Sequence, residues 1–187
     1  MILSVKERGQ FVATMRYINV WLMETMASWV PSTPEMEVKL QFGEHLWDAA
    51  QHADAFGKRT SELRMPLQHS LPPAGEFIEF LDSISGIEPT QQRLAAIYDV
   101  LLPALAMHYR RFLEKTDTLA DAPTVRIIER HLSDIDRMLQ ANREMCAELP
   151  DLTLDDQVWI DALRNREAQH EPVAASGAET ETRAVGT

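Results

Sequence analysis

The spacing of apolar residues predicts α-helices along most of the chain. In four long segments, inward residues recur alternately three and four positions apart, which places them on one helix face. No segment alternates with a period of two, as a half-buried strand would. The four stripes are Phe11, Met15, Ile18, Leu22, Thr25 and Trp29; Val38, Phe42, His45, Ala49, His52 and Phe56; Leu94, Ile97 or Tyr98, Leu101, Leu105, His108 and Phe112; and Val125, Ile128, Leu132, Ile135, Leu139, Asn142 and Cys146.

Prolines and capping residues define where these helices are expected to end. Thr33 is predicted to cap the second long helix, with Pro34 at its first helical position. Pro103 lies inside the third, where we expect a kink because proline removes a backbone hydrogen bond. The predicted long helices cover about residues 4–30, 33–64, 90–115 and 122–149.

Two shorter helices are also predicted. One covers residues 76–84, and the other covers 154–166 after a Thr153 cap, with Val158, Trp159 and Leu163 as its apolar anchors. Four long amphipathic helices bury their stripes together most simply as an antiparallel four-helix bundle. We therefore expect an all-α domain over residues 1–168, followed by a disordered acidic tail over 169–187.

Composition excludes several classes of protein. The chain has 187 residues and a formal net charge of -11, which disfavours binding to nucleic acid. The sequence contains no apolar segment long enough to span a membrane. Its single cysteine, Cys146, cannot form an internal disulfide and is expected to be a packed, inert thiol. These features predict a cytoplasmic protein without a nucleic-acid or membrane partner.

Candidate chemistry lies on the second helix, where two histidines replace apolar residues on the inward face. Asp48 lies three residues after His45 and four before His52, so it can meet either on one face. Glu24 borders the first stripe, and His108 lies on the third. Together these five residues form a candidate metal site, because imidazole and carboxylate ligands suit iron, manganese or zinc. Aromatic residues expected to wall an adjoining pocket are Tyr17, Trp21 and Trp47.

This pattern resembles the ferritin-like proteins, in which long antiparallel helices carry inward carboxylates and histidines. The resemblance implies an iron or manganese site and a non-haem oxidase or oxygenase acting on a small molecule. The family's signature includes Glu-x-x-His on two helices. Here the second helix has Asp48-x-x-x-His52 instead, and the one literal match is Glu167 to His170, at the edge of the predicted tail.

A metal-free alternative stays open. In it the His–Asp cluster is a buried polar network, and the chain is a non-enzymatic bundle that forms a homodimer or binds a partner or ligand. His131 and Asp134 lie beside the predicted fourth stripe and are expected to be solvated.

Overall fold

The structure is a computed structural model that describes residues 3–169. Within this range its regular secondary structure is helical and it contains no strand, which confirms the all-α prediction. The predicted tail lies outside the described residues, apart from Gln169. The elements are α1 (Val5–Trp29), α2 (Met36–Glu62), α3 (Gly75–Ser85), α4 (Thr90–Leu94), the π-helix η1 (Ala95–Leu101), α5 (Leu102–Lys115), α6 (Ala122–Glu148), the 3₁₀ turn η2 (Pro150–Leu152) and α7 (Gln157–Ala168).

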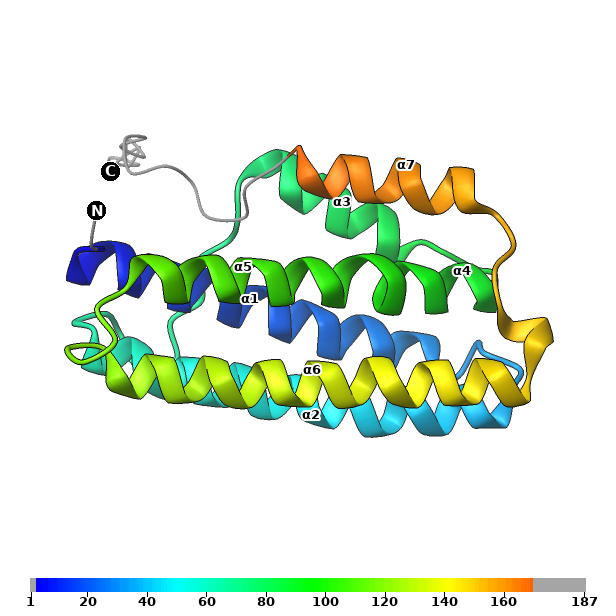
Figure 1. Cartoon of the computed structure of the whole chain (residues 1–187), viewed down its shortest axis with the longest axis horizontal. Helices are drawn as coiled ribbons and strands as arrows, with labels where there is room; N and C mark the ends of the chain where they lie inside the picture. Colours follow the sequence, from blue (N-terminus) through cyan, green and yellow to red (C-terminus); the bar gives the residue numbers. More distant parts are fainter. Residues whose placement is uncertain (1–2, 170–187) are drawn as a thin grey trace, which may run out of the picture.

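The long helices lie alongside one another, with α3 and α7 together at one side (Figure 1). The elements α4, η1 and α5 follow without a break and form one continuous rod. The start of α1 lies at the end of α5, where the Leu3 amide donates to the Lys115 carbonyl (3.1 Å) and Phe11 stacks on Phe112 (4.2 Å between ring centroids). The segment after α2 reaches α3 across α1, since the Leu71 amide donates to the Ala13 carbonyl (3.1 Å).

Local capping explains the beginning of α1 and corrects the predicted beginning of α2. Ser4 and Glu7 form a reciprocal capping box, so α1 starts where the sequence predicts. Thr33 does not cap α2, because its hydroxyl donates to the Trp29 carbonyl (2.9 Å) and so helps to end α1. Glu35 occupies the cap position of α2 instead.

The π-helix η1 lies immediately before Pro103, where the sequence predicts a kink. Proline has no N–H to donate to the carbonyl of Asp99, four residues earlier. The Nε of Arg164, on α7, donates to that carbonyl oxygen (3.2 Å). The rod therefore adapts to the proline with wider helical turns, and α7 supplies a hydrogen bond at that point.

The core contains most of the predicted apolar stripes, but the buried face of α6 differs from the prediction. Leu132 and Leu139 are only half-buried. The buried residues of α6 are Thr124, Ile128, His131, Ile135, Met138 and Asn142. Thr124, His131 and Met138 are buried where the prediction has the following residues, Val125, Leu132 and Leu139. The three-four spacing is kept, and His131 faces inward. On α7, the predicted anchor Val158 is 83% exposed, whereas Leu163 is buried and Trp159 is half-buried against the core as predicted; Ile160 is a further buried anchor.

A row of polar pairs joins α2 to α6 along most of their length, and we call it the polar seam. Its pairs are Gln41–Asn142 (3.0 Å), Asp48–Arg137 (2.9 Å), His52–Asp134 (3.1 Å) and Arg59–Asp121 (2.7 Å), the last at the N-cap of α6. Residue numbers rise along α2 as they fall along α6, so the two helices run in opposite directions. Hydrocarbon surfaces can slide over one another, whereas these pairs fix the register.

The last pair of the seam is buried, although Arg59 also forms an ion pair with Glu62, which is exposed. The Asp121 side chain is completely buried, and its two oxygens accept hydrogen bonds from Arg59, Thr116 (2.9 Å) and Thr124 (2.6 Å). Thr124 also accepts a hydrogen bond from the Nε of Arg59 (2.8 Å). This cluster ties the connection between α5 and α6 to the end of α2.

No helix within residues 3–169 is both long enough and apolar enough to cross a membrane.

Replacing Asp121 by Ala should lower the free energy of unfolding by about 3–5 kcal/mol, because it removes the buried carboxylate of Arg59 and leaves only the exposed Glu62 as its ionic partner. Urea denaturation followed by circular dichroism measures the change. Asp136→Ala is the control, since Asp136 is exposed and 4.0 Å from Arg110, and it should cost less than about 0.5 kcal/mol. Equal effects of the two substitutions would contradict the assignment.

Candidate functional site

The inward face of α2 presents the predicted site residues, but it directs them to different partners. His45 lies against η1: its Nδ1 is 2.7 Å from the Tyr98 hydroxyl, and its Nε2 is buried without a partner. Burial lowers the pKa of His45 to about 4, because the charged imidazolium is poorly solvated there. Burial likewise raises the pKa of Tyr98, which keeps the phenol protonated.

His52 lies two helical turns further along α2 and faces α6. Its Nε2 is 3.1 Å from Asp134, and its ring stacks on His131 with centroids 3.8 Å apart. Burial lowers the pKa of His52, although the hydrogen bond to Asp134 acts in the opposite direction. Burial and the neighbouring His52 lower the pKa of His131 to about 2. Two stacked imidazoles in a dry site are thus held neutral.

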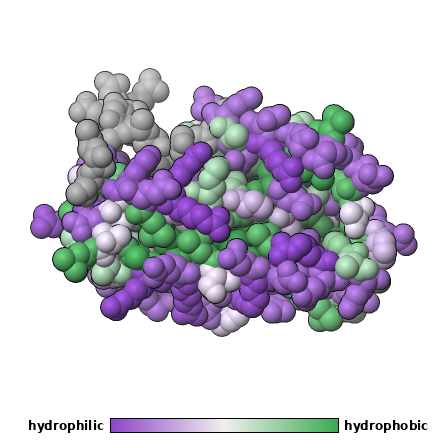
Figure 2. All heavy atoms as spheres, viewed as in Figure 1, coloured by the Kyte–Doolittle hydropathy of each residue, from purple (hydrophilic) through white to green (hydrophobic). Residues whose placement is uncertain are grey.

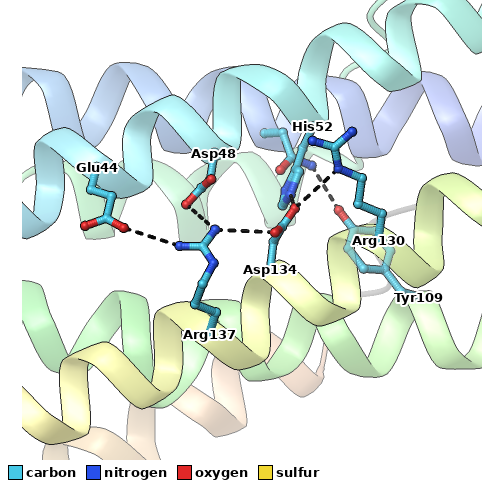
Figure 3. A network of polar contacts seen from close by, with 8 residues as sticks. Glu44, Asp48, His52, Tyr109, Arg130, Asp134 and Arg137 are labelled. Atoms are coloured by element: carbon cyan, nitrogen blue, oxygen red, sulfur yellow. Dashed lines mark hydrogen bonds and ion pairs between the residues drawn. The ribbon is translucent and has the colours of Figure 1, made fainter.

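Asp48 is bound by a cationic side chain from α6. Arg137 lies between helices α2 and α6 and donates to Asp48 (2.9 Å), Asp134 (3.3 Å) and Glu44 (3.4 Å), as Figure 3 shows. The hydrogen bond to Asp48 raises the pKa of Arg137. Arg137 therefore supplies the positive charge that a bound metal ion would otherwise supply to Asp48.

His108 is held on the other side of the molecule by α7. Its Nε2 is 2.9 Å from Glu167, and both side chains are buried. The sequence places Glu167 next to the predicted tail, and the structure makes it the buried partner that fastens α7 to α5.

The remaining predicted site residues do not line an interior site. Glu24 is exposed on α1, on the flank of its buried stripe. Trp47 is 63% exposed because, two residues after His45, it lies on the opposite side of α2. Tyr17 and Trp21 are half-buried against the core. Trp47 therefore faces away from the buried histidines of α2, and a pocket walled by these three aromatic residues stays a prediction.

The five predicted ligands are consequently spread over separate contacts. Across the part of the chain that the structure describes, no three histidine, cysteine, aspartate or glutamate side chains are grouped so that they could hold a metal ion. In this arrangement, His45, His52, His108 and Asp48 each form a hydrogen bond with a side chain on a neighbouring helix.

Comparisons with protein-family models, with curated proteins and with solved structures found no match to this chain.

The predicted site omits the residues that complete it, namely Tyr98, His131, Asp134, Arg137 and Glu167. The prediction that His131 and Asp134 are solvated is wrong: His131 is buried, and Asp134 accepts hydrogen bonds from α2 and α6. A signal for His131 exists in the sequence, because it lies three residues after Ile128 and four before Ile135. Arg137 carries no such signal, since two of its partners, Asp48 and Glu44, come from another helix.

The stability of the protein should fall as the pH is lowered from about 7 to about 5. The folded-state pKa values of His45, His52 and His131 lie below their ordinary value, so the unfolded chain binds protons first. Their stabilising contribution is complete above about pH 6.5 and is lost as the pH falls below it.

Urea denaturation at a series of pH values tests this expectation. His131→Leu should reduce the slope of unfolding free energy against pH by up to about 1.4 kcal/mol per pH unit, since it removes one such proton. A wild-type profile that is flat between about pH 7 and 5 would show that these imidazoles are not held neutral.

Proposed function

We propose that this chain is a non-enzymatic helical bundle that pairs with a second copy of itself through the outer face of α2. The observation that carries the proposal is an apolar stripe on that face. Met36, Leu40 and Trp47 are 61%, 67% and 63% exposed, and Gly43 lies between the last two. We call these four residues the outer stripe.

The outer stripe has the spacing of a coiled-coil seam. Its members follow one another at intervals of four, three and four residues, as a and d positions of a heptad do. The core-facing residues of α2 lie on the opposite side of the helix, so α2 has two apolar faces. An amphipathic helix of a monomer needs only one.

Side-chain sizes along the stripe favour a second copy as its occupant. In a parallel pair, the indole of Trp47 would enter a hole bounded by Gly43 and Ala50 of the second copy. A Cβ built on Gly43 meets nothing within 4 Å, so this position is open. Trp47 of each copy would therefore be the knob, and Gly43 and Ala50 would leave space for the hole that receives it.

Charges beside the stripe favour the parallel orientation. Lys39 precedes Leu40 and Glu44 follows Gly43, on opposite flanks of the stripe. Parallel pairing brings residues on these flanks together when they are five positions apart. Glu44 of one copy would then accept a hydrogen bond from Lys39 of the other in addition to the one from Arg137 of its own chain (3.4 Å). Two such ion pairs would form, related by the twofold axis.

The contacts of the predicted metal ligands support a non-enzymatic reading. Asp48, His52 and His108 each have a partner within the protein, and Glu24 is exposed on a different helix. The ferritin-like relationship, the four-helix bundle of that family and an iron or manganese oxidase stay predictions.

Sedimentation equilibrium should detect a dimer of the wild-type chain. Trp47→Glu should weaken it about tenfold or more, since a buried aromatic at the centre of an interface contributes strongly. Val158→Glu is the matched control because it changes an equally exposed apolar residue on α7, and it should leave the dimer intact. Both variants should keep the wild-type melting temperature of the monomer.

Charge reversal tests the orientation. Lys39→Glu and Glu44→Lys should each weaken the dimer, because each places like charges opposite one another, and the double variant should restore it. A wild-type chain that stays monomeric would overturn the proposal, as would a dimer unaffected by Trp47→Glu. Failure of the double variant to recover would exclude the parallel orientation.

A further inference from the structure

A small cavity lies between α2 and α6, beside the stacked imidazoles, and Gln51, one turn after Trp47, forms part of its wall. Its volume is about 150 Å³. Its wall includes His52 and Ala55 of α2, and Arg126, Ile127, Arg130 and His131 of α6. An apolar cavity of about this size in another protein accommodates benzene, so a molecule of roughly six non-hydrogen atoms fits.

The rim of the cavity is cationic although the chain as a whole is acidic. Arg126 and Arg130 lie one turn apart on the exposed side of α6. The side chain of Arg126 makes no hydrogen bond or ion pair with any of residues 3–169. The nearest carboxylate to Arg130 is Asp134 at 3.9 Å, which is already bonded to His52. The two guanidinium groups therefore carry more positive charge than the neighbouring carboxylate of Asp134 can neutralise.

The inner wall is apolar and includes one unsatisfied polar group. Ile127 and Ala55 contribute hydrocarbon, and the ring of His131 packs edge-on against Phe56 with centroids 4.6 Å apart. His131 is 1% exposed, and its Nδ1 has no hydrogen-bond partner. An unpartnered buried nitrogen is costly, and the wall beside it offers hydrocarbon in place of a hydrogen-bond partner.

We propose that this cavity binds a short aliphatic carboxylate. The carboxylate group pairs with Arg126 and Arg130 at the rim, since a guanidinium offers two parallel N–H donors to a carboxylate. The alkyl chain lies against Ile127, Ala55 and the imidazole faces, where it is shielded from water. The ligand needs both parts, because the cationic rim calls for an anionic group and the apolar inner wall calls for a hydrocarbon chain. The site is independent of the proposed dimer.

Titration with sodium butyrate, followed by heteronuclear NMR of the full chain, tests the proposal. Saturable shifts should appear at residues 51–55 and 126–131 and at the ring protons of His52 and His131. Butanol lacks the charge and inorganic phosphate lacks the alkyl chain, so each should bind about tenfold or more weakly. These probes separate the carboxylate from simple apolar filling and from general anion binding.

Two variants locate the site. Arg126→Gln should weaken butyrate about tenfold or more, because it removes a charge-assisted pair. Arg143→Gln is the matched control: Arg143 is exposed on the same helix and bonds to Gln140 (2.7 Å), and its loss should change nothing. Ala55→Leu should fill the cavity and abolish binding while the helical circular dichroism spectrum stays unchanged.

Several results would overturn the assignment. These are the absence of saturable shifts with butyrate, phosphate binding as tight as butyrate binding, and equal affinities of the Arg126→Gln and Arg143→Gln variants. Retained binding in a folded Ala55→Leu variant would place butyrate elsewhere on the protein.

Discussion

The arrangement of this protein depends on one constraint, which is that polar side chains on the inward face of α2 must find partners on a neighbouring helix. Leaving a buried donor or acceptor unpaired costs about 1–3 kcal/mol, comparable to a large part of the stability of a small domain. The polar seam meets this requirement from Gln41 at one end of α2 to Arg59 near the other. It also fixes how far α6 can slide along α2, and thereby which residues meet in the core.

The sequence predicts the helices well because their spacing and end signals are local. Ser4 and Glu7 mark the start of α1, and the stripes of α1 and α2 are largely buried as expected. The offset on α6 arises because two stripes one residue apart, one through Leu132 and one through His131, have almost the same spacing. Only the neighbouring helices decide which of them faces inward.

The candidate site could be predicted only in part, for the same reason. That His45 and His52 face inward follows from their spacing, and both are buried. The partner of His45 is Tyr98, 53 positions away in the chain, and the partner of His52 is Asp134, 82 positions away, so no local pattern identifies them. A carboxylate beside a histidine on one helix fits a metal site and an ion-pair network equally well. The decisive residue is Arg137, which binds the carboxylate of Asp48 directly.

The helix α2 thus has distinct roles on different sides. Its inward face builds the core, its contacts with α6 form the polar seam, and its outer stripe is exposed. The small cavity lies where the seam leaves an apolar space between His52 and Arg130. The stability of the polar seam depends on pH, because protonation of its buried, neutral imidazoles would place a charge in poorly solvated surroundings.

The most direct test of the metal-free polar seam is a double-mutant cycle on Asp48→Asn and Arg137→Gln, measured by urea denaturation with a chelator present and again after anaerobic addition of Fe²⁺. The account predicts a coupling energy of about 0.5–1 kcal/mol that is the same in both conditions, because the carboxylate and the guanidinium bind each other directly. A coupling energy of zero with the chelator, or stabilisation by Fe²⁺ that disappears in Asp48→Asn, would contradict it.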